Sequence, residues 1–335
     1  MGKNKEYLDE DIMDITVQMI GIGGVDRLKA VACLFQEPMH GTVRVRHEAI
    51  GVNFIDIYQR TGLYALPLPA TLGVEGAGIV EAVGENVTGF SVGDRVAYAG
   101  APVGAYTATR LIPAARLVRL PNVITSEVAA ASMLKGLTAH MLLTHTYHVE
   151  AGTTLLVHAA AGGLGSMLVR WAKHLGATVI GTAGSLQKQK IALAAGADHV
   201  IVGRDADIAA EVARLTNGRG VDFAIDGIGG SMLQKTLACV RRFGTVASIG
   251  QAAGPIPPIA IADLGPLRSL SLACPSVMAY AADINFYSAA TDALLDVMQL
   301  GVIASVGAKY RLSDVATAHT DLESGSTTGS LILIP

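Results

Sequence analysis

The chain is poor in cysteine, with only three among its 335 residues. Cys33, Cys239 and Cys274 lie far apart, so they fit neither a disulfide framework nor the paired spacing of a zinc site. Scattered single cysteines are typical of proteins in a reducing compartment. We therefore expect a cytoplasmic protein.

An excess of positive charge is also lacking. Lysine and arginine together number 25 against 28 aspartate and glutamate residues, and no basic tract or stripe interrupts the sequence. Proteins that bind nucleic acids neutralise phosphates with clustered basic residues. The sequence therefore predicts no nucleic-acid partner.

Long hydrophobic runs are equally scarce. Residues 151–169 contain no Asp, Glu, Lys or Arg, but His158 and the glycines at 162, 163 and 165 interrupt them, so a buried strand that runs into a helix is the better interpretation. We expect no membrane span. Residues 1–12 are polar and lack the apolar core of a signal peptide, and Met13 is a candidate internal start. We interpret 1–12 as an N-terminal extension.

What the sequence does contain is typical of an α/β protein with two domains. Hydrophobic residues make up 51% of the chain but aromatic residues only 5%. At about 150 residues for each domain, the length predicts two domains. The first third has short alternating segments separated by Gly, Pro and Asn turns, which predicts β-structure. From Thr153 onward, strand and helix patterns alternate.

Six apolar segments in the second half predict a Rossmann-type, doubly wound parallel sheet. They are residues 153–159, 178–183, 199–202, 221–227, 244–250 and 269–273. Before them, residues 126–143 have helical spacing, with Ser126 as the expected N-cap. The tail from Asn285 has helical and strand patterns without a dinucleotide motif, and we expect it to complete the first domain.

The sharpest local motif is the glycine-rich loop, HAAAGGLG, at residues 158–165. It lies between a predicted strand and a predicted helix. Small residues there let the backbone approach a pyrophosphate, and the free N–H groups of the helix N-terminus favour its charge. Ala160 replaces the first glycine of the usual fingerprint, so an ordinary tight turn stays open as the alternative.

Basic residues indicate which dinucleotide this loop binds. In NAD-binding sheets the second strand usually ends in an acidic residue that holds the ribose hydroxyls, but here it ends in TAGS at 182–185. Lys188, Lys190 and Arg204 follow, and cations without a competing carboxylate suit the 2′-phosphate of NADP. The alternative is that the two lysines form a solvated helix face.

Five segments together carry a resemblance to a known family. They are GVNFIDIYQRTGLY (51–64), LGVEGAG (72–78), VGDRVAY (92–98), AAASMLKGLTAHMLL (129–143) and HAAAGGLG (158–165). From about Met13 to Pro335, the chain resembles the zinc-independent quinone oxidoreductases. These are the zeta-crystallin-like group of the medium-chain dehydrogenase/reductase superfamily.

The resemblance implies an architecture, a reaction and an assembly. A GroES-like, β-rich catalytic domain would comprise residues 13–136 and 276–335, and a Rossmann domain that binds NADPH would comprise residues 137–275. The implied enzyme passes reducing equivalents from NADPH to a quinone in the cleft between the domains. The implied assembly is a homodimer that pairs the edge strands of the two cofactor sheets.

Site residues also follow from the resemblance. Asn53, Tyr58 and Tyr64 would be the catalytic residues that line the nicotinamide and quinone cleft, with Asp56 orienting their loop. Taken without the resemblance, each tyrosine is better interpreted as a half-buried loop anchor. The implied cofactor contacts are Asn53, Lys135, Ala161, Gly162, Gly163, Leu164, Gly184, Lys188, Arg204, Ser248, Ile249, Gly250, Pro275, Gly329, Ser330 and Leu331.

No metal is expected. Asn53 stands where the zinc alcohol dehydrogenases of the superfamily place their first cysteine ligand, and Gly73-Val74-Glu75 replaces their Gly-His-Glu. Catalytic zinc needs three protein ligands and an open position. The histidines are interpreted as structural or surface residues; those considered are His140, His145, His148 and His158.

Two departures from the family pattern bear on the function. Gly203 stands where an aromatic residue often stacks near the adenine, and Cys274 stands where an arginine often lies. Two other functions also stay open. One is an NADPH-dependent reductase of activated double bonds, as in alkenals or enoyl thioesters. The other is a non-catalytic RNA-binding or structural role.

Overall fold

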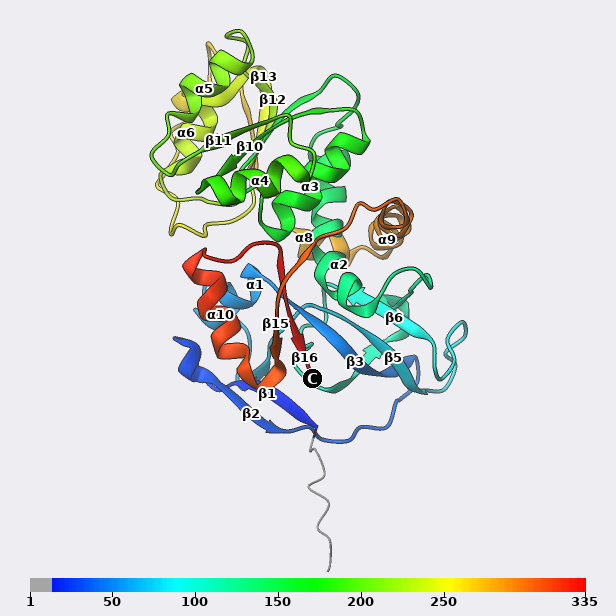
Figure 1. Ribbon diagram of the computed structural model, residues 1–335. Helices are drawn as coiled ribbons and strands as arrows, with labels where there is room; N and C mark the ends of the chain where they lie inside the picture. Colours follow the sequence, from blue (N-terminus) through cyan, green and yellow to red (C-terminus); the bar gives the residue numbers. More distant parts are fainter. Residues whose placement is uncertain (1–13) are drawn as a thin grey trace, which may run out of the picture.

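The computed structural model describes residues 14–335, and the predicted extension at 1–12 lies outside them. Figure 1 shows two lobes, one above the other; the upper lobe contains one β-sheet and the lower lobe contains two. No helix in the described part of the chain is both long and apolar enough to cross a bilayer.

The upper lobe in Figure 1 contains a six-stranded sheet. Its spatial order is β11-β10-β9-β12-β13-β14, and every pairing is parallel, which confirms the predicted doubly wound sheet. Because the winding reverses between β9 and β12, the loops after these strands face the crevice where such folds bind dinucleotides. The strands are β9 (Thr154–Val157), β10 (Thr178–Ala183), β11 (His199–Val202), β12 (Val221–Asp226), β13 (Val240–Ser248) and β14 (Ser271–Ala273).

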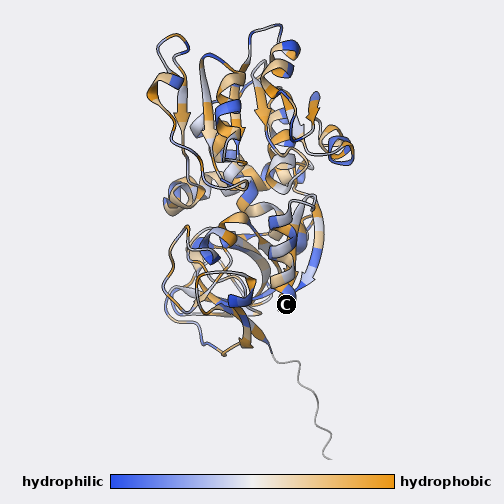
Figure 2. Cartoon of the chain, turned by 90° about the vertical axis from the view of Figure 1, so that its left-hand side faces the viewer, coloured by the Kyte–Doolittle hydropathy of each residue, from blue (hydrophilic) through white to orange (hydrophobic). Residues whose placement is uncertain are grey.

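Helices bury both faces of this sheet. Along β9, Leu155 and Val157 pack into one hydrophobic cluster whereas Leu156 packs into another, so successive side chains are buried on opposite faces. Figure 2 shows the resulting apolar strands inside the lobe. The helices of this lobe are α3 (Gly163–His174), α4 (Leu186–Ala194), α5 (Ile208–Leu215), α6 (Met232–Cys239) and α7 (Ile261–Leu264).

Two antiparallel-rich sheets build the lower lobe. One has the order β15-β16-β3-β5-β6-β8, with β7 also paired to β3, and the other has the order β2-β1-β4. The final strand β16 pairs antiparallel with β3, so the tail returns to this lobe. The strands are β1 (Ile15–Met19), β2 (Leu28–Ala32), β3 (Thr42–Val52), β4 (Ala70–Thr71), β5 (Glu75–Val83), β6 (Arg95–Ala99), β7 (Thr109–Pro113), β8 (Val118–Arg119), β15 (Val306–Arg311) and β16 (Ser330–Ile334).

The long helix α2 (Ser126–His140) packs against α3 of the upper lobe and against β3, β5 and β6 of the lower lobe. It runs through the predicted domain boundary at 136/137, so the division of the chain stays a prediction. The N-cap is Thr125, whose Oγ1 accepts from the Val128 N–H at 3.2 Å, and the prediction of Ser126 was wrong by one residue. The helix also ends earlier than residue 143, because a π-helical turn follows at Met141–Thr146.

One short helix, α1 (Phe54–Arg60), was not predicted from the sequence. The Asp56 carboxylate accepts from the Asn53 backbone N–H at 2.8 Å, which satisfies a free donor at the helix N-terminus. This capping contact fixes Asn53 at the start of the helix. The other helices of the described chain are the 3₁₀ turns Val25–Arg27, Ala114–Arg116 and Leu312–Asp314, and α8 (Val277–Ala282), α9 (Ile284–Gln299) and α10 (Val315–Ser324).

Candidate functional site

A buried triad of Asn53, Glu75 and Lys135 lies at the centre of the candidate site. Nζ of Lys135 is 2.7 Å from Oδ1 of Asn53 and 3.4 Å from Oε2 of Glu75. Nδ2 of Asn53 is 2.7 Å from the same glutamate oxygen. Charge-assisted hydrogen bonds thus join the start of α1, the start of β5 and the middle of α2.

These bonds fix the orientation of the Asn53 amide. Its oxygen accepts from the ammonium and its NH₂ donates to the carboxylate, because only this arrangement satisfies both neighbours. The other oxygen of Glu75 accepts from the Leu134 backbone N–H at 3.2 Å. Sequence reasoning placed Asn53 and Lys135 in the site but missed Glu75 as their partner. The available signal was an acidic residue at the start of a strand whose next five residues are all Gly, Ala, Ile or Val.

A second buried network lies behind α1. The Tyr106 hydroxyl donates to Oδ2 of Asp56 at 2.8 Å and lies 2.9 Å from Nε2 of His319. Nε of Arg60 donates to Nδ1 of that histidine at 3.3 Å. Oδ1 of Asp56 has no hydrogen-bond partner among the described residues. Burial raises the pKa of Asp56 to about 7.

Asp56 makes the stability depend on pH. Its pKa in the folded protein lies above its ordinary value, so the folded chain holds this proton more tightly, and stability should fall as pH rises from about 4 to about 7. We expect Asp56→Asn to remove a loss of about 3 kcal/mol between pH 5 and pH 8, since the carboxyl titrates over about two units above pH 5 at about 1.36 kcal/mol for each unit. Urea unfolding of both proteins at pH 5 and pH 8 measures this, and equal pH dependence in the two would contradict it. The comparison cancels the opposite contribution of buried His47, whose pKa is lowered to about 4.

The two predicted tyrosines lie next to each other. Their ring centroids are 5.6 Å apart in an edge-to-face arrangement. The Tyr58 hydroxyl accepts from the Gln251 backbone N–H at 2.9 Å, so it reaches from α1 of the lower lobe to the loop after β13 of the upper lobe. Tyr64 is 50% exposed, as a loop anchor would be. The contact with Gln251 shows that Tyr58 does more than anchor its own loop.

The glycine-rich loop has the predicted position between β9 and α3. Gly162 forms an isolated parallel bridge with Gly329, and the Gly329 N–H donates to the carbonyl of Ala161 at 3.2 Å. A Cβ added at Gly163 would lie 2.6 Å from Oγ of Ser330. The structure therefore brings the loop and the tail together, although they are far apart in sequence.

Lys135 joins the triad to this loop. A Cβ added at Gly163 would lie 2.9 Å from Cε of Lys135. The lysine stem thus passes beside the first residue of α3 while its ammonium reaches Asn53. The candidate cofactor loop and the candidate catalytic amide are adjacent for this reason.

Gly165 allows the loop to close onto the helix. A Cβ there would overlap the carbonyl oxygen of Ala159, a backbone atom that cannot move without opening the turn. We expect Gly165→Ala to lower the free energy of unfolding by about 1–3 kcal/mol, the usual range for overpacking. Urea denaturation tests this, with Gly265→Ala as the control because a Cβ there meets only open space. Equal, small effects of both substitutions would contradict the prediction.

Lys188 and Arg204 converge near the start of α4. Nζ of Lys188 donates to the Gly325 carbonyl at 2.6 Å. Cβ atoms added at Gly325 and Gly184 would each lie 3.9 Å from the Arg204 guanidinium. Burial and the nearby arginine lower the pKa of Lys188. Two cations held side by side favour an anion between them, whereas Lys190 is exposed on the same helix.

The predicted contacts at the end of β13 lie beside the tyrosines. Ser248 is buried, the Ile249 N–H donates to the Asp226 carbonyl at 2.8 Å, and a Cβ added at Gly250 would lie 3.2 Å from the Tyr58 hydroxyl. Leu331 is different, because its side chain is buried in the lower-lobe core. A contact of Leu331 with a ligand would have to come from its backbone.

The remaining predicted positions flank the site. Leu164 packs against the core beneath α3, and Pro275 is half-buried after β14. Gly203 has φ = 112°, where a residue with a side chain is strained, so the backbone itself explains why glycine stands there. Cys274 is exposed after β14.

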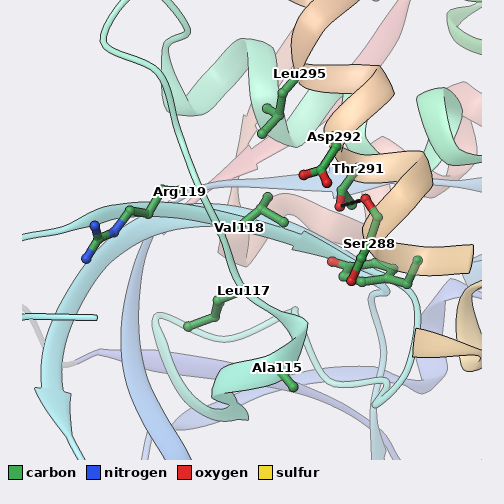
Figure 3. A pocket seen from close by; sticks show the side chains of 9 residues that line it. Ala115, Leu117, Val118, Arg119, Ser288, Thr291, Asp292 and Leu295 are labelled. Carbon is green, nitrogen blue, oxygen red and sulfur yellow. Dashed lines mark hydrogen bonds between the residues drawn. The ribbon is translucent and has the colours of Figure 1, made fainter. Parts of the chain in front are cut away.

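Residues 14–335 contain no candidate metal site, and two hollows lie outside the candidate functional site. No group of three or more His, Cys, Asp or Glu side chains in that range is arranged to hold a metal ion. A hollow of about 420 Å³ lies between β8 and α9, where Arg119 and Asp292 line it, as Figure 3 shows. Another of about 310 Å³ is lined by Arg241 and Arg268. Both hollows are lined by residues other than the triad and the glycine-rich loop.

Two protein-family models match successive parts of the chain. The alcohol dehydrogenase GroES-like domain matches residues 39–122, and the zinc-binding dehydrogenase model matches residues 163–299. The first range covers most of the lower-lobe sheet and the triad residues Asn53 and Glu75. The second begins at the glycine-rich loop.

Whole-length relatives are also similar to the chain. A quinone oxidoreductase from Pseudomonas aeruginosa is 41% identical over 321 residues, which are 95% of this chain and 99% of the relative. A 2-haloacrylate reductase from Burkholderia sp is 40% identical over 322 residues, which are 93% of this chain and 96% of the relative. The crystal structure of Escherichia coli quinone oxidoreductase complexed with NADPH matches with a TM-score of 0.91 at 39% identity, covering 96% of this chain and all of that one.

Proposed function

Because the chain belongs to the quinone oxidoreductase family of the medium-chain dehydrogenase/reductase superfamily, we propose that it transfers reducing equivalents from NADPH to a quinone without zinc. Membership at about 40% identity over nearly the whole chain makes it an oxidoreductase enzyme. The quinone, the independence from zinc and the roles of single residues are the proposal.

The observation that carries the proposal is the position of Asn53 and Lys135 against the glycine-rich loop. The lysine stem lies beside Gly163 and its ammonium holds the Asn53 amide. A catalytic amide is therefore fixed next to the place where a helix N-terminus would receive a pyrophosphate. An ordinary tight turn would need no such partner.

The residues present fit NADPH at two places, the glycine-rich loop and the pair formed by Lys188 and Arg204. A side chain at Gly163 would collide with Ser330 and Lys135, so the glycine lets the loop backbone lie against both. Small residues at these positions are what a pyrophosphate-binding turn requires. Lys188 and Arg204 supply paired positive charge where the 2′-phosphate of the adenosine would lie. When bound, NADPH supplies a hydride from its nicotinamide.

The protein's contribution to the reaction is orientation. Asn53 gives one amide N–H to Glu75 and keeps its second for a ligand. The Tyr58 hydroxyl accepts from the Gln251 N–H, which leaves its own hydrogen free to donate to a quinone oxygen as negative charge develops there. Burial raises the pKa of Tyr58, so we assign it hydrogen bonding rather than proton transfer.

Independence from zinc is supported by the partner of Glu75. This buried carboxylate already has a cation, because the Lys135 ammonium lies 3.4 Å away. Asn53 is a neutral amide whose orientation that pair fixes. The three side chains satisfy one another and offer no set of three ligands for a metal.

A homodimer is the assembly we propose. Strand β14 ends the order of the cofactor sheet among the described residues, so its outer edge can pair with a second copy. Phe243, Ile261 and Leu267 are exposed apolar residues in the segments around this edge. Light scattering after gel filtration should give twice the mass of one chain at micromolar concentration, and a monomer there would contradict the proposal.

A cytoplasmic location stays part of the proposal. The thiols of Cys33, Cys239 and Cys274 are all unpaired, as they would be in a reducing compartment.

The function is tested by following NADPH oxidation by absorbance with several acceptors. The panel contains 1,4-benzoquinone, 9,10-phenanthrenequinone, a 2-alkenal and crotonyl-CoA, with NADH as a parallel donor. We expect turnover of a quinone, faster with NADPH than with NADH at equal concentration. The absence of quinone turnover by a chain that binds NADPH would contradict the assignment of the acceptor.

Reduction of an activated double bond is the second candidate function. It is favoured by the similarity to the 2-haloacrylate reductase, whose named substrate is an electron-poor alkene. The same amide and phenol could bind a carbonyl oxygen conjugated to the alkene. Turnover of the alkenal or crotonyl-CoA without turnover of either quinone would favour this function.

A further inference from the structure

Beneath the glycine-rich loop, four side chains form a continuous chain of hydrogen bonds. Nδ1 of His158 lies 3.1 Å from Oγ1 of Thr182, and its Nε2 lies 2.8 Å from Oγ1 of Thr236. The Thr236 hydroxyl lies 2.7 Å from Oδ2 of Asp226. The chain thus joins the ends of β9, β10 and β12 to α6. Its members other than Thr182 are buried, where an unpaired polar group is costly.

The direction of donation along this chain follows from its far end. The Thr236 hydroxyl donates to Asp226 rather than to the Met232 carbonyl at 3.0 Å, because the carboxylate is nearer and is the stronger acceptor. The Thr236 oxygen therefore accepts from the Nε2–H of His158. Nδ1 of the neutral ring is then an acceptor for the Thr182 hydroxyl. Burial lowers the pKa of His158, which keeps the ring in this neutral form.

The near end of the chain holds a strained residue. Ala159 has φ = 50°, in the left-handed region that residues with a side chain rarely adopt. Its N–H lies 3.3 Å from the Thr182 oxygen, which is free to accept because its hydrogen is given to His158. The Ala159 carbonyl accepts from the Gly162 N–H at 2.9 Å and lies against Gly165. The conformation of Ala159 therefore sets the turn by which the loop enters α3.

The same series of hydrogen bonds also reaches the loop after β12. Oδ1 of Asp226 accepts from the backbone N–H groups of Ile228 and Gly229 at 2.8 and 3.0 Å. The Ile228 carbonyl in turn accepts from the Ala253 N–H at 2.8 Å. Asp226, the last of the four hydrogen-bonded side chains, is thus tied to the segment that follows β13, beside Gln251 and Tyr58.

We propose that Thr182 and His158 are positioning residues for the cofactor, because they hold Ala159 in the left-handed turn that aims the N–H groups of the glycine-rich loop at the pyrophosphate. The sequence alone indicates only a structural or surface role for His158. This inference rests on the proposed function, since it assumes that the loop binds NADPH. The role lies in cofactor affinity, and neither side chain is assigned a contact with the reacting atoms.

The test is a fluorescence titration of the full-length protein with NADPH. Thr182→Val keeps the shape of the side chain but removes the hydroxyl. We expect it to raise the dissociation constant for NADPH about tenfold or more, where tenfold corresponds to about 1.4 kcal/mol of binding free energy at 25 °C. Thr182→Ser restores the hydroxyl and should restore most of the affinity. The matched control is Thr216→Val, because the Thr216 hydroxyl also accepts a backbone N–H, from Gly220 at 2.9 Å, but at the opposite end of the sheet.

A second pair of variants separates positioning from general destabilisation. Glycine adopts the left-handed region without strain. The left-handed conformation at position 159 should therefore need support from Thr182 when the residue is alanine but much less when it is glycine. We expect Thr182→Val to weaken NADPH binding much less in an Ala159→Gly background than in the unaltered protein. The loss of thermal stability caused by Thr182→Val should be similar in both. The turnover rate at saturating NADPH should change less than the affinity.

The outcomes separate this inference from the function on which it rests. Failure of the unaltered protein to bind NADPH would overturn the proposed function. Binding by the unaltered protein with equal effects of Thr182→Val and Thr216→Val would overturn the positioning role alone. An undiminished effect in the Ala159→Gly background would also overturn it. If Thr182→Val does not fold, Thr182→Ser is compared with the unaltered protein instead. Because serine keeps the hydroxyl, a large loss of NADPH affinity in Thr182→Ser would contradict the proposal.

Discussion

Replacement of Lys135 by methionine is expected to lower the free energy of unfolding by about 3–5 kcal/mol, the cost of leaving one partner of a buried ion pair alone. The Lys135 ammonium lies 2.7 Å from Oδ1 of Asn53 and 3.4 Å from Oε2 of Glu75, which is fully buried. Methionine keeps the stem beside Gly163 but leaves the carboxylate without a cation. Urea denaturation followed by circular dichroism measures the loss.

Two further variants show whether charge or packing causes this loss. Glu75→Gln in the Lys135→Met background removes the unpaired carboxylate, so the double variant should recover most of the lost stability. Lys235→Met removes an exposed lysine from α6 and should change stability by less than about 0.5 kcal/mol. A double variant as unstable as Lys135→Met would show that packing, and not the buried charge, dominates at this position.

The second large effect is expected where Lys188 and Arg204 converge. Loss of a hydrogen bond to a charged group costs about 1.5–3 kcal/mol, and each 1.4 kcal/mol is a factor of ten. The Lys188→Ala/Arg204→Ala variant should therefore raise the KM for NADPH about 100-fold and leave the KM for NADH nearly unchanged. The physical reason is that only NADPH carries the 2′-phosphate.

The control for this effect is Lys190→Ala. Lys190 lies on the same helix but is exposed, whereas Lys188 reaches the Gly325 carbonyl. Steady-state kinetics with both dinucleotides should show almost no change for the control. Equal losses for NADPH and NADH in the double variant would contradict recognition of the phosphate. A loss for Lys190→Ala as large as that for the double variant would favour a diffuse basic surface instead.

Local patterns in the sequence were sufficient to predict the cofactor sheet. Each strand of a doubly wound sheet is buried on both faces, so it appears as a short apolar run that needs no distant partner to be recognised. All six predicted strands are present and in parallel pairing. The glycine-rich loop was equally clear, because a tight strand-to-helix turn needs small residues at fixed positions.

The errors were also local and have local causes. Thr125 and Ser126 are both good caps, and the structure uses Thr125 because the Ser126 hydroxyl donates to Glu48 instead. Helix α1 was not predicted because it has only seven residues, too few for an apolar period to emerge. Its cap is visible in the sequence only as Asn53 and Asp56 three residues apart.

The sequence by itself determined the alternation of strands and helices, the glycine-rich loop and the supply of cations after the second strand of the cofactor sheet. Each of these depends on residues close together in the chain. Only the tertiary structure decided that Glu75 pairs with Lys135 and Asn53, that Tyr58 reaches Gln251, and that Thr182 supports Ala159. These contacts join residues on separate elements, and their geometry exists only after the sheets and α2 have packed, because a hydrogen bond is specified by distance and direction and not by spacing along the chain.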